Sequence, residues 1–158
     1  MSVRSGIGYD SHRLVAGRPL VLGGVELTSD LGLHGHSDAD VLTHAVIDAL
    51  LGAAGLGDIG MHFPDSDERY RDADSIGLLR AAVALVRAAG FAIVNVDATV
   101  LMEEPKLGDA RQRMRARLAE ALSLDPADVN VKATSGEVIG FVGRREGVAA
   151  LAIATLDG

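Results

Sequence analysis

Cysteine and tryptophan are absent from this 158-residue sequence, and aromatic residues make up only 3% of it. The lack of cysteine excludes disulfides, thiolate zinc sites and cysteine nucleophiles, so any metal must be bound by histidine and carboxylate side chains. No apolar run approaches the roughly 20 residues that a membrane-spanning helix requires, and residues 1–25 lack the pattern of a signal peptide. We therefore expect a cytoplasmic protein with no membrane partner.

Positive charge is also scarce. The sequence has 15 Lys and Arg residues against 22 Asp and Glu residues, which gives a formal net charge of −7, and the basic residues form no continuous stripe. This distribution argues against a nucleic-acid partner. Apolar residues make up 48% of a chain that is long enough to bury its own core. We expect a single domain over residues 1–158, with some apolar surface left for contacts between subunits.

The pattern of apolar and turn-forming residues predicts alternating strands and helices. Strands are expected over residues 3–14, 91–102, 129–133 and 148–156, with a hairpin over 20–27 that turns at Gly23 and Gly24. Helices are expected over about 38–53, 74–89 and 109–122, whereas residues 55–74, rich in glycine, aspartate and proline, should form a long loop. This order predicts an α/β fold of the α+β type, in which helices cover one side of a small mixed sheet.

Three side chains near the N-terminus, Asp10, His12 and His44, have the chemistry of a metal site. Residues two apart in a strand point to the same face, so Asp10 and His12 would lie side by side, and His44 could approach them from the following helix. Two imidazoles and a carboxylate suit zinc, and a tetrahedral ion with three protein ligands keeps one position open for water or substrate. The set therefore predicts a catalytic rather than a structural zinc site.

A simpler interpretation exists for the polar residues of the first predicted helix. Asp40, His44 and Asp48 lie four residues apart on one helix face. Asp40 would favour the helix N-terminus electrostatically by about 0.3–1 kcal/mol, and His44 would be an ordinary surface residue. The presence of Asp10 and His12 in the preceding strand favours the metal site over this interpretation.

Loop segments carry further candidate binding groups. Asp58–Gly60, Phe63–Asp67 and Glu103–Lys106 could each be ordinary turns. In Lys132–Glu137, which follows a predicted strand, backbone N–H groups, two hydroxyls and a lysine could surround a phosphate. The carboxylate of Glu137 would repel that phosphate, and a hard cation such as magnesium between them would resolve the conflict.

Eight short motifs, taken in order, resemble one enzyme family across nearly the whole chain. They are GxDxH at 8–12, HSDxD at 36–40, His44, LGDIG at 56–60, FPDxD at 63–67, PK at 105–106, VKAT at 131–134 and GFxGRxEG at 140–147. The family is 2-C-methyl-D-erythritol 2,4-cyclodiphosphate synthase of the non-mevalonate isoprenoid pathway. Each motif alone is weak, whereas eight in sequence are hard to produce by chance.

The resemblance implies a phosphorus-oxygen lyase. Such an enzyme converts 4-diphosphocytidyl-2-C-methyl-D-erythritol 2-phosphate into the cyclic diphosphate by attack of the 2-phosphate on the β-phosphate, and it releases CMP. The resemblance also implies one Zn²⁺ per subunit and a Mg²⁺ or Mn²⁺ ion that bridges the diphosphate. The family assembles as a homotrimer with active sites at the subunit interfaces, where one chain holds the zinc and its neighbour provides the cytidine pocket.

The matching residues fall into groups by their implied role. His36 and Ser135 match the groups that stabilise the transition state, and the implied metal ligands are Asp10, His12, His44 and Glu137. Substrate contacts are implied for Asp10, Ser11, His12, His36, Ser37, Asp58, Ile59, Gly60, Phe63, Pro64, Asp65, Ser66, Asp67, Met102, Glu103, Glu104, Pro105, Lys106, Leu107, Gly108, Thr134, Ser135, Gly136, Glu137, Phe141 and Arg144. We expect Asp40 to orient the histidine ligands.

Phe141 and Arg144 match residues that line a central cavity, in which the family holds isoprenoid diphosphates. A packed aromatic and an exposed arginine would explain this pair equally well.

Four positions depart from the family pattern. Ala39 replaces a glycine and should be tolerated if its backbone is helical. Gly136 removes the second hydroxyl of a Thr-Thr pair, Met102 replaces an alanine beside the cytosine, and Arg145 replaces a glycine. We expect these changes to leave the reaction intact and to affect base contacts and the central cavity.

Two other functions stay open. A zinc phosphohydrolase would use water as the nucleophile and would give an open-chain product. A non-enzymatic trimer that binds nucleotides or isoprenoids would be favoured by a degraded metal site, but Asp10, His12 and His44 are all present.

Overall fold

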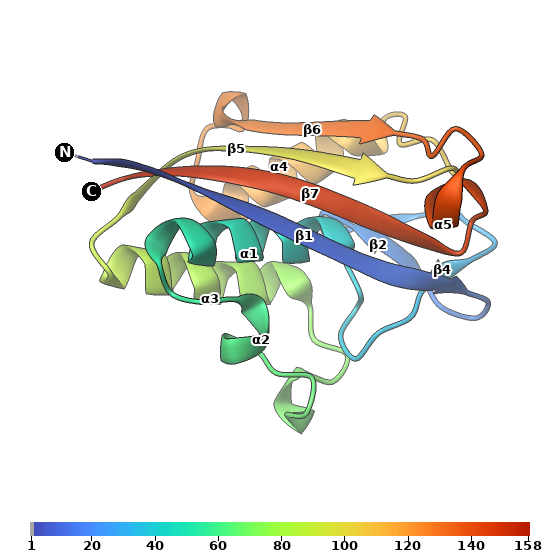
Figure 1. Ribbon diagram of the computed structural model, residues 1–158, viewed down its shortest axis with the longest axis horizontal. Helices are drawn as coiled ribbons and strands as arrows, with labels where there is room; N and C mark the ends of the chain where they lie inside the picture. Colours follow the sequence, from blue (N-terminus) through green and yellow to red (C-terminus); the bar gives the residue numbers. More distant parts are fainter. Residues whose placement is uncertain (1) are drawn as a thin grey trace.

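The computed structural model describes residues 2–158 and consists of strands and helices that alternate along the chain (Figure 1). The strands are β1 (Val3–Val15), β2 (Leu20–Leu22), β3 (Val25–Leu27), β4 (Gly32–Leu33), β5 (Ala92–Leu101), β6 (Val129–Thr134) and β7 (Gly147–Asp157). The helices are α1 (Val41–Ala54), α2 (Ile59–His62), α3 (Ser75–Ala88), α4 (Ala110–Leu122) and α5 (Gly140–Gly143), with 3-10 turns η1 (Glu68–Tyr70) and η2 (Pro126–Asp128).

Five strands form a mixed sheet in the order β4-β1-β7-β5-β6, and β2 pairs with β3 in a separate hairpin. The β5–β6 pair is parallel, and the other pairs are antiparallel. Helix α1 packs on β1 and β7, α4 packs on β6, and α3 packs against both helices, so one side of the sheet is covered (Figure 1). This arrangement confirms the expected fold class.

Strand β1 and helix α1 pack with their backbones close together. Gly6 and Gly8 lie on the face of β1 that contacts α1, and a Cβ atom at Gly8 would overlap the carbonyl oxygen of Ala45. Because strand residues alternate between faces, Asp10 and His12 follow these glycines on the same face. Because glycine has no side chain, the backbones of β1 and α1 approach closely, and the short side chain of Asp10 can reach the helix.

Helix α1 begins at Val41 rather than near residue 38, because Asp40 is its N-cap and accepts a hydrogen bond from Thr43 N. Ala39 lies before the helix and has a φ of 57°, in the left-handed region that favours glycine. The helical backbone on which its tolerance was expected to depend is therefore absent. Alanine at this position carries a backbone cost of about 1–2 kcal/mol.

Asp40 joins α1 to the β2–β3 hairpin. Its buried carboxylate accepts hydrogen bonds from Gly23 N at 2.9 Å, Gly24 N at 2.8 Å, Thr43 N at 3.0 Å and Thr43 Oγ1 at 2.8 Å. Burial raises the pKa of Asp40 above its usual value, even though these donors lower it. Within residues 2–158 the Asp40 side chain hydrogen-bonds to no histidine, so any effect of Asp40 on the orientation of His44 would act through the start of α1.

The remaining boundaries agree closely with the sequence-based expectations. The predicted hairpin turns at Gly23 and Gly24, and helices α3 and α4 and strands β1, β5, β6 and β7 occur where expected. The expected long loop over 55–74 contains α2 and η1, whose N-caps Asp58 and Asp67 accept hydrogen bonds from Met61 N and Arg69 N. In the part of the chain that the structure describes, no helix is long and apolar enough to cross a membrane.

The second face of the sheet is open and partly apolar. Ile7, Tyr9 and Ile153 are 69%, 53% and 51% exposed, and Ile7 lies opposite Ile153 across the β1–β7 pair. Exposed apolar patches of this kind mark surfaces that contact another protein.

Candidate active site

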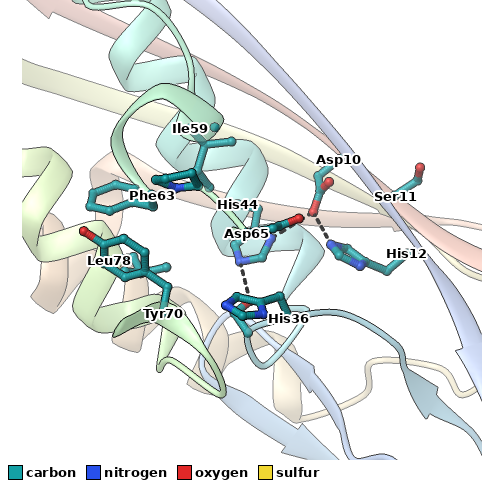
Figure 2. Close-up of a pocket in the computed structure, with 13 residues that line it drawn as sticks. Asp10, Ser11, His12, His36, His44, Ile59, Phe63, Asp65, Tyr70 and Leu78 are labelled. Carbon is teal, nitrogen blue, oxygen red and sulfur yellow. Dashed lines mark hydrogen bonds and ion pairs between the residues drawn. The ribbon is translucent and has the colours of Figure 1, made fainter. Parts of the chain in front are cut away.

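Asp10, His12 and His44 converge at the point where β1 passes the first turns of α1 (Figure 2). Asp10 Oδ2 lies 3.1 Å from His12 Nε2 and 3.0 Å from His44 Nδ1. The predicted strand pair and helical histidine are therefore brought together. The imidazole rings of His12 and His44 meet edge to face, with centroids 5.7 Å apart.

The spacing of these donor atoms fits zinc. With zinc bonds of about 2.0–2.1 Å and tetrahedral angles, neighbouring ligand atoms lie about 3.3 Å apart, close to the two separations found here. His12 Nδ1 lies 2.7 Å from the carbonyl oxygen of His34, which can only accept, so His12 carries a proton on Nδ1, and in the neutral ring the lone pair of Nε2 faces Asp10. Within residues 2–158 this trio is the one cluster of three or more metal-ligating side chains.

The electrostatics of the cluster favour a positive charge beside Asp10. Burial raises the pKa of Asp10, but the hydrogen bonds and charges of His12 and His44 outweigh it, so the pKa lies below its usual value. Burial lowers the pKa of His12, whereas the Asp10 carboxylate, the His34 carbonyl and the charge of Asp65 raise it, and the net pKa is raised. A proton or a cation is therefore held strongly at this position.

A cleft of about 320 Å³ opens in front of the three ligands. Figure 2 shows Phe63 and Tyr70 on the side opposite Asp10, and their rings meet edge to face with centroids 5.6 Å apart. His36 also faces the cleft and is held by a 3.1 Å hydrogen bond from its Nε2 to the carbonyl of Asp67. The other predicted residues that line it are Ser11, Ser37, Ile59, Gly60, Pro64 and Asp65.

A second cleft of about 170 Å³ lies where the parallel strands β5 and β6 end. Its predicted members are Met102, Pro105, Lys106, Leu107, Gly108, Thr134 and Ser135. Within the described chain, the two clefts share no lining residue. One chain alone therefore does not bring the metal ligands and the predicted cytidine pocket together.

Several predicted site residues lie beside these clefts rather than in their walls. Glu103 accepts a 2.5 Å hydrogen bond from Gly136 N, and Glu104 lies 3.7 Å from Arg145. Asp58 and Asp67 cap α2 and η1, whereas Ser66 and Glu137 line neither cleft. Phe141 lines a separate shallow cleft with His12, and Arg144 pairs with Glu146.

The structure explains two of the departures from the family pattern. A Cβ atom at Gly136 would lie 2.5 Å from the backbone nitrogen of Gly143, so no second hydroxyl residue fits there without movement of the backbone. Arg145 has a φ of 56° and pairs with Asp30 at 2.8 Å. It therefore ties the chain after α5 to the loop before β4.

Five residues that face or support the clefts were missed from the sequence. Tyr70 and Leu78 line the first cleft, Arg111 and Ala133 line the second, and Ser75 hydrogen-bonds to His44. Leu78 and Ser75 belong to α3, whose sequence pattern indicates only a helix with one apolar face. No signal in the sequence places that helix beside His44.

A sheet covered on one side by helices, with a carboxylate and two histidines that could hold a metal ion at one cleft, defines an enzyme of the α+β class with a possible metal site. Comparison with known proteins agrees, because a model of the YgbB family matches residues 3–157. The 2-C-methyl-D-erythritol 2,4-cyclodiphosphate synthase of Salinibacter ruber is 62% identical over 155 residues, which cover 98% of this chain and 99% of that protein.

Solved structures show the same fold. The bifunctional IspDF of Campylobacter jejuni is 46% identical with a TM-score of 0.94, and the match covers 98% of this chain and 42% of that chain. A 2C-methyl-D-erythritol-2,4-cyclodiphosphate synthase in its CDP-bound form is 39% identical with a TM-score of 0.90, over 98% of this chain and all of that one (100%). The chain belongs to the YgbB family of 2-C-methyl-D-erythritol 2,4-cyclodiphosphate synthases, which are lyases of isoprenoid biosynthesis.

Proposed function

We propose that this chain converts 4-diphosphocytidyl-2-C-methyl-D-erythritol 2-phosphate into 2-C-methyl-D-erythritol 2,4-cyclodiphosphate and CMP. The observation that carries the proposal is the convergence of Asp10, His12 and His44 at a cleft, in a chain 62% identical to a synthase of that name. Zinc is the proposed occupant of the cluster, and Glu137 would hold a Mg²⁺ or Mn²⁺ ion. When bound, these ions would neutralise and polarise the diphosphate.

The protein residues mainly position the substrate in this proposal. An oxygen of the substrate's own 2-phosphate, already ionised at neutral pH, forms the new bond to the β-phosphorus. The bond to the α-phosphate breaks, and its electron pair leaves with CMP. No strong general base is required. His36, Ser135 and the residues that line the clefts would hold the substrate in a folded conformation and stabilise charge on the transferring phosphorus.

We propose that the active site is completed by a second copy of the chain in a homotrimer. Two observations support this proposal. The first cleft, which holds Asp10, His12 and His44, and the second cleft, which Lys106 lines, share no residue within one chain, and the open face of the sheet exposes Ile7, Tyr9 and Ile153. The cleft at Lys106 would take the cytidine of a neighbour's substrate. Residues 1–158 would act as one catalytic domain in the cytoplasm, and Phe141 and Arg144 would face an isoprenoid diphosphate on the trimer axis.

Product analysis tests the reaction type. We expect phosphorus NMR to show conversion of the cytidylyl substrate to the cyclic diphosphate, with one CMP formed for each molecule of product, and we expect a zinc chelator to stop this conversion. Release of CMP together with an open-chain diphosphate would instead identify a hydrolase. Binding of the substrate without turnover in metal-loaded protein would identify a non-enzymatic binding protein.

Subunit complementation tests the shared site. We expect His44→Ala and Lys106→Ala to be nearly inactive alone, because each lacks one half of every site. After random reassembly at equal concentrations, mixed trimers would each contain one intact site, which restores about a quarter of the wild-type activity. If the mixture stays as inactive as its components while light scattering shows mixed trimers, each site belongs to a single chain.

A further inference from the structure

The ring nitrogen of His44 that faces away from Asp10 takes part in a chain of hydrogen bonds that is buried at Ser75 and half-buried at Asp38. His44 Nε2 lies 2.8 Å from Ser75 Oγ, and Ser75 Oγ in turn hydrogen-bonds to Asp38 Oδ1. Ser75 is fully buried, and His44 is 8% exposed. Neither Ser75 nor Asp38 lines the cleft in front of the metal ligands.

The direction of the protons in this chain follows from the groups themselves. The Asp38 carboxylate can only accept, and a serine hydroxyl has one proton to donate, so Ser75 donates its proton to Asp38. Ser75 Oγ must then accept from His44, which places a proton on Nε2. In the neutral ring, Nδ1 is left with a lone pair that points at Asp10 Oδ2, 3.0 Å away. Two acceptors at this separation require a proton or a metal cation between them, and a bound metal ion takes the place of the proton.

Asp38 is itself held by the backbone. Its Oδ2 accepts from Ser75 N at 2.9 Å and its Oδ1 from Asp40 N at 3.1 Å. Ser37 Oγ also approaches His44 Nε2, but at 3.3 Å, and it already accepts from Ala39 N. Ser75 is therefore the principal partner of the ring, and Asp38 fixes the orientation of Ser75.

We propose that Ser75 and Asp38 are positioning residues that hold the proton of His44 on Nε2 and so present Nδ1 as a metal ligand. The inference rests on the proposed metal site and gives Ser75 and Asp38 a role there that the sequence did not indicate. Hydrogen bonds of this kind to the distal nitrogen of a ligating histidine fix the ring and strengthen metal binding.

The test measures zinc affinity by competition with a chromophoric chelator. We expect Ser75→Ala to weaken zinc binding about 10–100-fold, and Asp38→Ala to weaken it by a smaller factor because Ser75 can still accept from His44. Asp74→Ala is the matched control, since Asp74 caps the same helix through Ile76 N and does not belong to the chain of hydrogen bonds. Its zinc affinity should equal that of the wild type.

A second measurement separates positioning from a loss of folding. In zinc-loaded wild-type protein, the Nε2 proton of His44 should give a downfield NMR resonance protected from exchange with water. Ser75→Ala should shift this resonance and speed its exchange, whereas Ser75→Thr, which keeps the hydroxyl, should restore both the resonance and the affinity. Equal zinc affinity in wild type, Ser75→Ala and Asp38→Ala, or an equal loss in Asp74→Ala, would overturn the inference. If the wild type itself binds no zinc, the proposed metal site fails as well.

Discussion

Replacing His44 by alanine is expected to abolish stoichiometric zinc binding and to lower turnover by about a thousandfold or more. The imidazole is one of three donors to the cluster, and two donors leave zinc without the set that a catalytic site uses. Loss of several kcal/mol of charge stabilisation on the diphosphate corresponds to a rate loss of this size. Metal analysis of the purified protein and single-turnover rates measure the two effects.

His34→Ala is the matched control for this substitution. The His34 side chain is exposed, and only its backbone carbonyl contacts His12, so the substitution removes an imidazole near the site but keeps the hydrogen bond. Zinc content and turnover should be retained. Full activity of His44→Ala, or of wild type in metal-free buffer, would rule out the proposed role of the cluster.

Gly8→Ala is expected to unfold the protein or to destabilise it by about 4 kcal/mol or more, which is beyond the usual range for an overpacked core. The added methyl group would overlap the carbonyl oxygen of Ala45, and the atoms in conflict belong to the backbone of α1, so no change of rotamer relieves them. Any folded fraction should also bind zinc poorly, because β1 and α1 carry Asp10 and His44. Urea denaturation followed by circular dichroism measures the loss.

Gly77→Ala is the matched control, and in the same experiment we expect it to stabilise the protein rather than destabilise it. Gly77 lies inside α3, and a Cβ atom added there would meet no heavy atom of the described residues within 4 Å, apart from its own helix backbone and chain neighbours. Alanine there should stabilise the protein by about 0.5–1 kcal/mol, because it removes the conformational freedom of glycine in the unfolded chain. Equal effects of the two substitutions would show that close contact between β1 and α1 does not decide stability.

The metal cluster could be predicted because its signal is local. Two-residue spacing in a strand places Asp10 and His12 on one face, and a helix after the intervening hairpin brings His44 within reach. The position of Asp40 was harder to interpret, because the sequence shows an acidic residue four positions before His44 and does not show which way it turns. In the structure it is the N-cap of α1 and binds the hairpin turn.

Residues that contact the site from distant segments could not be predicted. Ser75 is buried beside His44 because α3 packs against α1, and that packing depends on the fold as a whole. The short elements β4 and α5 were also missed, since two to four residues are too few to show a period. The two clefts are separate because one lies at the ends of β5 and β6 and the other at β1 and α1. The spacing of residues along the chain does not reveal how far apart these elements lie in space.

The alternation of side chains along β1 makes metal binding depend on the correct strand register. Asp10 and His12 point toward α1, while Ile7 and Tyr9 point outward, and the continuous pairing of β1 with β7 fixes this choice. A slip by one position would turn both donors outward and press Ile7 and Tyr9 against a helix that leaves room only for glycine. Chains with the wrong register would therefore bind no metal. The molar ratio of zinc to protein would then equal the fraction of correctly folded molecules in a preparation.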